Sequence, residues 1–393
     1  MRWFRIAFAA AALAATGAAA PSPDAWTPAW TASMWQATNP DQRVLVENAT
    51  IRAAVRVGMG GSKLRLRLAN EYGAALAIGA ATVRIAGGPT VRVTFDGQGS
   101  TQLPQGAPLV SDPVALPVRA FDVVEVSLFL PERAEIETVH DAGGQPTQVS
   151  GPGDHSGGDF VPARTTRFRP LIAGIDVLGA KARPVVVAYG DSITDNTGCA
   201  NDAVPICRWG DVLGRRFARA GMPQVVVTQA ISGNRILATG AGPSALARFD
   251  RDVLAMPGVT HVVLLEGIND IGNSGLERNG VKNPEVTAAQ LIQGFRQLVE
   301  RAHGHGIKVI AMTILPFEGA KYARPEGEAI RVRVNDWMRS SGELDAVIDM
   351  EKVVGDPANP RRLADALQFG DNLHPNAAGE TKMGEAIPLG LFR

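Results

Sequence analysis

Two parts of the chain differ in the period of their hydrophobic residues. Between residues 26 and 170, apolar and polar residues alternate, as in the run Leu-Arg-Leu-Arg-Leu at residues 64–68. A period of two is typical of strands that bury one face. Residues 91–95 and 123–130 repeat the pattern, and prolines separate the runs. These short strands predict a β-sandwich or a jelly roll.

A hairpin is expected at residues 51–68. Val55 and Val57 end one apolar run, the segment Gly-Met-Gly-Gly-Ser follows at residues 58–62, and the alternating leucines come next. Two such runs joined by a short glycine-rich turn are typical of paired antiparallel strands.

From about residue 181, continuous apolar runs alternate with helical periods. Residues 291–299 place apolar side chains on one face of a helix that is expected to end near Gly304 or Gly306. Alternating β and α units predict a parallel sheet of about five strands with helices on both sides. Five runs are expected to be strands buried on both faces: residues 185–188, 225–227, 262–265, 309–312 and 346–348.

The first twenty residues are predicted to be a secretory signal peptide. Arg2 and Arg5 give a positive start, residues 6–15 are apolar, and three alanines end the segment. The apolar run is too short to cross a bilayer, although a retained anchor is the alternative. We therefore expect a β-sandwich domain at residues 21–180 and an α/β domain at residues 181–393, in a bacterial protein that is periplasmic or secreted.

The net charge of the chain limits the kinds of partner that it is expected to bind. The chain has 39 basic and 39 acidic residues, so its formal net charge is zero. Nucleic acids and anionic membranes both select a basic excess, so neither is expected to be the main partner. No later segment approaches about 18 consecutive apolar residues, so no integral membrane segment is expected in the mature chain.

The two cysteines, Cys199 and Cys207, are expected to form a local disulfide in an oxidising compartment. A metal site on this pair is less favoured, because no histidine or third cysteine lies nearby at ligand spacing. No metal is therefore predicted.

Small polar motifs follow three consecutive predicted strands. Ser192 follows the first strand in the sequence Gly-Asp-Ser, Gly233 lies in the turn after the second, and Asn269 follows the third in Gly-Ile-Asn-Asp. Ligands bind beyond the carboxyl ends of strands in a parallel sheet, so all three should meet at one edge. Each motif alone has an ordinary explanation, since serine caps helices and Gly and Asn are common in loops.

The motif Asp-Asn-Leu-His-Pro near the C-terminus supplies the remaining groups. Asp371 lies three residues before His374, close enough to bond the imidazole and fix its tautomer. Pro375 suits the first turn of the last helix. A capping aspartate beside a surface histidine is the alternative, but none of the other five of the six histidines has this setting.

Together these residues follow the logic of Ser-His-Asp acyl transfer. Ser192 is the predicted nucleophile, His374 the base and Asp371 the group that orients it. The backbone N–H groups of Ser192 and Gly233 and the side-chain amide of Asn269 are predicted to form the oxyanion hole. The chain has no Gly-x-Ser-x-Gly pentapeptide, which argues against the nucleophile elbow of α/β-hydrolases. It also lacks the glycine motifs of nucleotide-binding proteins.

The four motifs resemble those of the SGNH (GDSL-type) serine hydrolases, an esterase family whose marker residues match Ser192, Gly233, Asn269 and His374. The resemblance covers about residues 183–393 and implies a flavodoxin-like three-layer fold and a cofactor-free serine esterase. The first motif reads Gly-Asp-Ser-Ile instead of Gly-Asp-Ser-Leu, a conservative departure. The β-rich half is similar, in general pattern only, to domains that precede the hydrolase in some secreted bacterial members.

We therefore expect an exported ester hydrolase that forms an acyl-enzyme. Carbohydrate O-acetyl esters or other short-chain O-acyl esters are the expected substrates, and lysophospholipids or aryl esters are the alternative within this class. The same residues would serve an acyltransferase. A non-catalytic carbohydrate-binding protein with a hydrolase remnant is the alternative from another class.

Two roles are open for the β-rich half. It could bind polymer independently through a platform of Trp26, Trp30 and Trp35, or dock on the catalytic half and shape the rim of the site through residues 140–155. The junction at residues 179–183 is short and lacks a flexible tether. A short junction favours docking.

Overall fold

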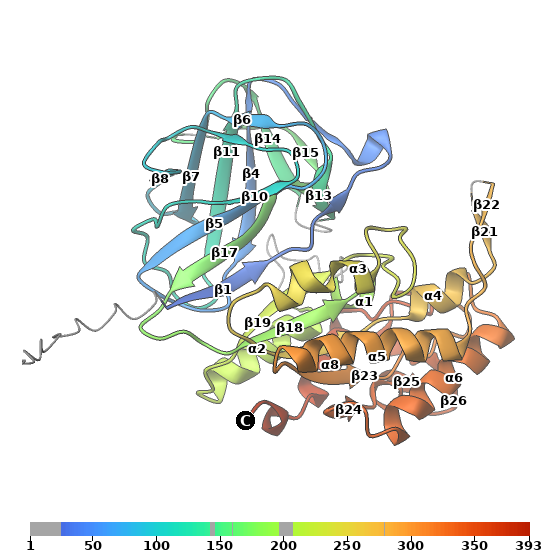
Figure 1. Ribbon diagram of the computed structural model, residues 1–393. Helices are drawn as coiled ribbons and strands as arrows, with labels where there is room; N and C mark the ends of the chain where they lie inside the picture. The colour runs from blue at the N-terminus through green and yellow to red at the C-terminus, as the bar shows by residue number, and fades with distance from the viewer. Residues whose placement is uncertain (1–24, 142–145, 159, 196–206, 279) are drawn as a thin grey trace, which may run out of the picture.

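The chain forms an N-terminal β-region, residues 25–178, and a C-terminal α/β-region, residues 185–393 (Figure 1). The predicted signal peptide lies outside the described residues. None of the helices in the described part of the chain is long and apolar enough to span a membrane. The computed structural model describes residues 25–141, 146–158, 160–195, 207–278 and 280–393.

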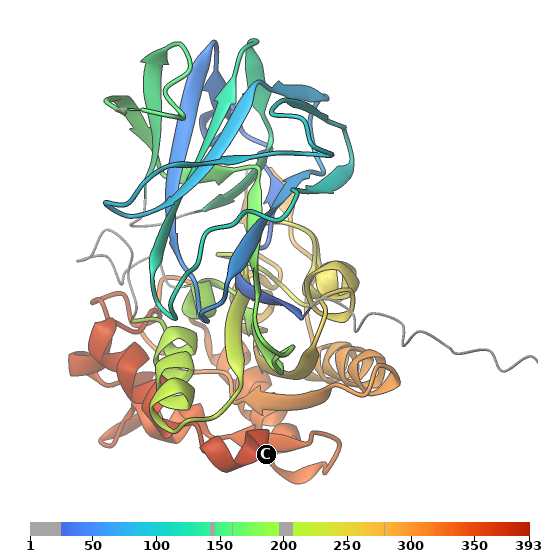
Figure 2. The same cartoon turned by 90° about the vertical axis from the view of Figure 1, so that its left-hand side faces the viewer.

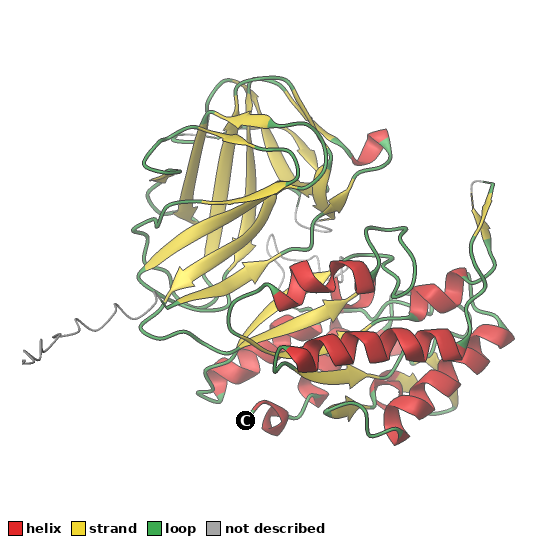
Figure 3. Ribbon diagram, in the orientation of Figure 1, coloured by secondary structure: helices red, strands yellow, loops and turns green. Residues whose placement is uncertain are grey.

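Two antiparallel sheets make up most of the β-region, which confirms the prediction of a β-rich N-terminal part (Figure 3). Their buried side chains, such as Leu64 and Leu66 from one sheet and Ile51 and Val55 from the other, belong to one hydrophobic cluster. The first sheet has the order β1 (Trp26–Thr31), β17 (Ile172–Leu178), β5 (Lys63–Asn70) and β10 (Ala107–Val110). The second has the order β15 (Pro162–Thr166), β14 (Thr147–Pro152), β4 (Ala49–Arg56), β11 (Val123–Leu130), β7 (Ala80–Ile85) and β8 (Val91–Val93).

Short strands extend the β-region beyond these two sheets. They pair as β16 (Phe168–Pro170), β13 (Thr138–Asp141) and β2 (Trp35–Gln36); as β12 (Ala134–Ile136) and β3 (Val44–Val46); and as β6 (Leu76–Ile78) and β9 (Thr101–Leu103).

The expected hairpin at residues 51–68 is wrong. Strand β4 pairs with β11 and β14, whereas β5 pairs with β17 and β10, so the two strands lie in different sheets. The glycine-rich segment between them crosses from one sheet to the other, because Gly61 N–H donates to the Val118 carbonyl and Ser62 N–H donates to the Leu178 carbonyl. The alternating pattern therefore predicted each strand but not its partner.

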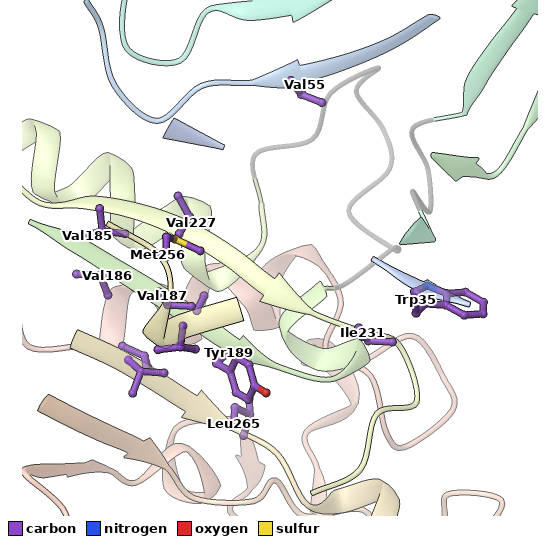
Figure 4. Packing of buried hydrophobic residues seen from close by; sticks show 14 of the residues in the cluster. Trp35, Val55, Val185, Val186, Val187, Tyr189, Val227, Ile231, Met256 and Leu265 are labelled. Carbon is purple, nitrogen blue, oxygen red and sulfur yellow. The ribbon is translucent and has the colours of Figure 1, made fainter. Parts of the chain in front are cut away.

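A five-stranded parallel sheet forms the centre of the α/β-region. All five predicted strands are present, and their order places the first strand between the second and the third, as in flavodoxin-like sheets. Val185, Val186 and Val187 are consecutive residues of β18 and all lie in the shared buried cluster, so both faces of the strand are buried, which accounts for the continuous apolar run (Figure 4). The order is β19 (Val225–Ala230), β18 (Val185–Gly190), β20 (Val259–Leu265), β23 (Lys308–Met312) and β24 (Ala346–Ile348).

Helices follow the strands, and the predicted helix ends at Gly304. The α/β-region also has two short two-stranded sheets. One pairs β21 (Glu277–Arg278) with β22 (Val281–Lys282), and the other pairs β25 (Gly355–Asp356) with β26 (Asn359–Leu363). The α-helices are α1 (Ser192–Asp195), α2 (Trp209–Arg219), α3 (Ala245–Phe249), α4 (Ile268–Asn273), α5 (Ala288–Gly304), α6 (Pro325–Ser340), α7 (Met350–Val354) and α8 (Ala377–Ala386). A π-helical turn (Asp250–Leu254) continues α3.

The β-region docks directly on the α/β-region, as expected from the short junction. Strand β1 packs against β19 at the edge of the parallel sheet (Figure 2). Thr31 Oγ1 donates to the Thr228 carbonyl over 2.9 Å, and Ser33 Oγ lies 2.6 Å from Gln229 Oε1. The Ser33 contact is buried and the Thr31 contact is partly buried, so the interface includes satisfied polar groups as well as apolar surface.

The three tryptophans pack against neighbouring side chains: Trp35 is buried, and Trp26 and Trp30 are half-buried. Trp35 is buried with its ring edge-on to Phe168. The Trp30 ring lies under the Arg169 guanidinium, 5.0 Å from centroid to Cζ, and the Trp26 ring lies in the same way under Arg65 at 4.7 Å. Each of the three rings therefore already takes part in packing.

Residues 181–393 expressed alone are expected to be poorly soluble and to unfold at a lower temperature than the full chain. Removal of the β-region uncovers the β19 edge and leaves buried polar groups without Ser33 and Thr31. Soluble yield and thermal unfolding of the fragment and of the full chain measure the effect. If the fragment has the Tm and the esterase activity of the full chain, the α/β-region does not need the docked β-region in order to fold.

Candidate active site

The turn after β18 places Ser192 at the carboxyl edge of the sheet. A Cβ atom at residue 190 would collide with the Thr194 side chain and the Leu265 carbonyl, so only glycine fits this close approach. Asp191 Oδ1 then accepts the N–H of Ile193 over 2.9 Å. Ser192 therefore begins helix α1 directly at the end of a buried strand.

The structure brings Ser192, His374 and Asp371 into one hydrogen-bonded chain. Ser192 Oγ lies 2.8 Å from His374 Nε2, and His374 Nδ1 lies 2.6 Å from Asp371 Oδ2. A carboxylate at Nδ1 accepts a hydrogen bond and so keeps the imidazole proton on Nδ1, which leaves Nε2 free to accept a hydrogen bond from the serine hydroxyl. This arrangement has the geometry that a serine nucleophile and its base require.

Asp371 is held as a carboxylate by its hydrogen bonds. Its Oδ1 atom accepts the backbone N–H groups of Leu373 at 3.0 Å and His374 at 2.9 Å. Partial burial alone would raise the pKa of Asp371, but these bonds and the imidazole outweigh burial and hold the pKa below its usual value. The aspartate is therefore negative at neutral pH, as an orienting group must be.

The loop that carries Asp371 and His374 is fixed by polar contacts. Gln368 Oε1 accepts the N–H groups of Gly370 and Asn372, at 2.8 and 2.9 Å. Helix α8 begins at Ala377 with Asn376 as its cap, so the expected place of Pro375 in the first turn is wrong. The Asn376 side chain caps two backbone N–H groups of the helix, and Pro375 belongs to the preceding loop.

Asn269 and Gly233 follow the two strands that flank β18, namely β20 and β19. Asn269 is in the first turn of α4, and its Nδ2 atom donates to Asp191 Oδ2 over 3.2 Å, next to Ser192 in the chain. Gly233 has a φ of +81°, a left-handed conformation that favours glycine. The four predicted motifs therefore converge at one edge of the sheet, while their catalytic roles stay predictions.

Three buried carboxyl groups lie beneath these loops. Burial raises the pKa of Asp191 to about 7 and that of Asp270 to about 6. Burial, with Asp191 close by, also raises the pKa of Glu266. Asp270 accepts the N–H groups of Ile236 at 2.7 Å and Leu237 at 3.0 Å, so it fixes the loop that follows Gly233.

Sequence reasoning missed the roles of these carboxyl groups. Asp191 and Asp270 stand inside the motifs Gly-Asp-Ser and Gly-Ile-Asn-Asp, so their place beside Ser192 and Asn269 was a signal that could have been used. Glu266 had a weaker signal, since it follows a buried apolar run directly.

The β-region reaches the nucleophile's helix through His140 in β13. His140 Nε2 lies 3.4 Å from Asp195 Oδ1, and Arg208 Nη2 lies 3.6 Å from the same oxygen. Burial would raise the pKa of Asp195, but His140 and Arg208 outweigh burial and lower it. The start of the segment expected to shape the rim therefore contacts helix α1, while residues 142–145 lie outside the described residues.

Two further expectations concern cysteine and metal. Cys199 lies outside the described residues, so its disulfide with Cys207 stays a prediction. In the described ranges, no three His, Cys, Asp or Glu side chains are grouped to hold a metal ion.

A serine, a histidine and an aspartate joined in this way at the edge of a parallel sheet are typical of α/β acyl hydrolases. Residues 188–382 match the model of the GDSL-like Lipase/Acylhydrolase family, and this part of the chain belongs to that family. No curated protein matches the sequence.

Solved structures similar to this chain include three hydrolases. A GDSL-like lipase from Bacteroides thetaiotaomicron has 20% identity, covering 54% of this chain and 92% of its own, with a TM-score of 0.38. The lipase/acylhydrolase from Enterococcus faecalis has 23% identity, covering 52% and 92%, with a TM-score of 0.39. A catalytic mutant of an acetylxylan esterase from Geobacillus stearothermophilus has 22% identity, covering 52% and 91%, with a TM-score of 0.41.

The raised pKa of Asp191 predicts a pH-dependent stability. Its folded pKa of about 7 lies above the unfolded value of 3.8, so the folded state holds a proton that the unfolded state has lost. The free energy of unfolding should therefore fall as the pH rises from about 4 to about 7. In the Asp191→Asn variant this fall should be smaller, so the Tm of the wild type relative to the variant should decrease across the window. A difference in Tm that stays constant with pH would contradict the assignment.

Proposed function

We propose that this protein is a serine ester hydrolase that acts through an acyl-enzyme on O-acyl esters. The observation that carries the proposal is the hydrogen-bonded chain from Ser192 through His374 to Asp371. Membership of residues 188–382 in an acylhydrolase family supports the same class of reaction.

In the first half-reaction, Ser192 Oγ attacks the ester carbonyl carbon while its proton moves to His374 Nε2. Asp371 stabilises the imidazolium that forms. The carbonyl oxygen becomes an oxyanion, and the N–H groups of Ser192 and Gly233 and the Asn269 amide donate to it. The intermediate then expels the alcohol, which takes the proton from His374, and Ser192 is left acylated.

In the second half-reaction, His374 takes a proton from water, and the resulting hydroxide equivalent attacks the acyl carbon. The same three donors bind the second oxyanion, and collapse releases the carboxylic acid and returns the proton to Ser192 Oγ. None of these steps calls for a metal or a cofactor. An acceptor sugar in place of water would give acyl transfer with the same residues.

Carbohydrate O-acetyl and other short-chain esters are the substrates that we propose. The His374 side chain keeps 31% of its surface exposed and that of Asp371 keeps 45%, so the base lies at an open rim. An open site admits a small acyl group attached to a bulky glycan, whereas a long acyl chain gains affinity from burial in an apolar cavity. Export to the periplasm or medium, proposed from the N-terminal sequence, would place the enzyme with such glycans.

Lysophospholipids and aryl esters are the alternative substrates, and an inactive carbohydrate-binding protein is the alternative from another class. The 2.8 Å contact between Ser192 and His374 favours an enzyme, because binding alone does not require a serine hydroxyl aligned with an oriented imidazole. A panel of acetylated glycans, p-nitrophenyl esters of rising chain length and lysophospholipid, with and without an acceptor sugar, separates these functions.

Ser192→Ala is expected to remove nearly all esterase activity with little change in Tm, because it deletes the nucleophile and one hydroxyl contact. Hydrolysis of p-nitrophenyl acetate and labelling by a fluorophosphonate measure the effect. Ser340→Ala, at the exposed end of α6, is the matched control and should behave as the wild type. Wild-type turnover in Ser192→Ala would exclude Ser192 as the nucleophile.

Asn269→Ala is expected to lower kcat about 10²–10³-fold with a smaller change in KM, because an oxyanion donor acts mainly in the transition state. Steady-state kinetics on p-nitrophenyl acetate give both constants. A change confined to KM would instead make Asn269 a substrate-binding residue.

A further inference from the structure

Arg248, in the short helix α3, is a fully buried arginine beside the predicted oxyanion hole. Its side chain has 0% exposure, and its guanidinium lies over the Tyr189 ring at 4.0 Å. Burial of a charged group away from water is unfavourable unless all of its hydrogen bonds are made. The partners that satisfy this guanidinium therefore indicate its role.

One set of partners lies on the loops that carry the predicted oxyanion donors. Arg248 Nη2 donates to the Gly190 carbonyl over 2.9 Å, and Gly190 stands two residues before Ser192. Arg248 Nε donates to Asn234 Oδ1 over 2.8 Å, and Asn234 follows Gly233 directly.

A third contact of this set, from Nη2 to Glu266 Oε1 at 3.4 Å, reaches the strand end before Asn269. A single side chain thus contacts the segments of all three predicted donors.

Asn234 transmits this contact to the loop around Gly233. While its Oδ1 accepts from Arg248, its Nδ2 donates to the carbonyls of Ala241 at 2.9 Å and Pro243 at 2.8 Å. The carboxamide thereby closes residues 234–243 into a loop of fixed shape. Gly233 directly precedes this closed loop.

The second set of partners reaches the β-region. Arg248 Nη1 donates to Asp252 Oδ2 over 2.9 Å and to the Gln229 carbonyl over 3.0 Å, both in the α/β-region, and it lies 3.2 Å from Ser33 Oγ of the β-region. Ser33 is itself fully buried, and its hydroxyl donates to Gln229 Oε1 at 2.6 Å or to Asp252 Oδ2 at 2.9 Å. The hydroxyl of Ser33 therefore inserts into the hydrogen-bond network of Arg248.

The backbone of Ser33 connects to the other side of the site. Its carbonyl lies 3.0 Å from His140 Nδ1, and His140 Nε2 faces Asp195 at the end of the nucleophile's helix. One residue of the β-region is thus linked to the oxyanion loops through its hydroxyl and to helix α1 through its carbonyl.

We propose that Arg248 is a positioning residue that holds the oxyanion hole in its working geometry, and that Ser33 is the residue through which the β-region fixes Arg248. This inference rests on the proposed esterase function. It gives the β-region a role in catalysis without any contact with substrate, because Ser33 Oγ accepts from Arg248 and donates to Gln229 Oε1 or Asp252 Oδ2, and so joins groups of the same network.

The test compares Ser33→Ala with Thr31→Val. Both substitutions remove one buried hydroxyl at the same interface, but the Thr31 hydroxyl donates to the Thr228 carbonyl and not to the Arg248 network. Each variant should lower Tm by about 1–3 °C, the effect of one lost hydrogen bond in a chain of this size. Only Ser33→Ala should lower kcat, by about tenfold, since small displacements of catalytic groups have large effects on rate.

Three further measurements identify the route of the effect. Ser33→Ala should weaken binding of a boronic acid, whose tetrahedral adduct occupies the oxyanion hole, in proportion to its loss of kcat/KM. The kcat losses of Ser33→Ala and Asn269→Ala should be less than additive in the double variant, because both act through the same donors. Arg248→Lys keeps the charge but cannot reach Gly190, Asn234 and Ser33 together, so it should also lower kcat at least tenfold.

Hydrogen exchange provides a readout that does not depend on activity. Backbone amides in residues 231–243 should exchange faster in Ser33→Ala than in the wild type, and at the wild-type rate in Thr31→Val. Equal kcat and equal exchange in the two variants would overturn the inference. Loss of the proposed function is separate: it would appear as a wild type without Ser192-dependent ester hydrolysis, and the exchange comparison would still decide the role of Ser33.

Discussion

The arrangement of the site depends on how one buried guanidinium is satisfied. A guanidinium has five N–H donors and stays charged, so it can be placed away from water only where acceptors surround it. For Arg248 these acceptors lie at or just after the ends of β18, β19 and β20, on Asp252, and on Ser33 of the β-region. Satisfying this one group therefore fixes three loops relative to each other. It also makes the contact between the two regions part of the site.

The sequence predicted elements better than it predicted their partners. All five parallel strands and the helix ending at Gly304 were expected, because burial on both faces and helical amphipathicity leave a local pattern. The hairpin at residues 51–68 was wrong, because alternation fixes which face of a strand is buried but not which strand lies beside it. Strand β4 pairs with β11, more than sixty residues away, and only the packed structure determines that choice.

The same distinction applies to the candidate site. Ser192, His374 and Asp371 were identified because the chemistry of acyl transfer requires those residue types, and the structure places them in contact. Arg248 and Ser33 carried no such signal. An arginine in a short helix and a serine between two strands are ordinary residues until the fold buries them together. The sequence thus predicts groups that react, whereas groups that hold the reacting groups in place become visible only through their contacts.

The buried carboxyl groups show why this support includes charge. An apolar residue in place of Asp191 would avoid the unfavourable burial that raises its pKa to about 7. No apolar side chain, however, can accept the Ile193 N–H with one oxygen and the Asn269 amide with the other. Asp270 joins the next pair of segments in the same way, through the N–H groups of Ile236 and Leu237. The burial of these two carboxyl groups is unfavourable for folding, yet the same groups connect the loops of the site. Replacing them with apolar residues would remove the cost of burial, but it would also release those loops.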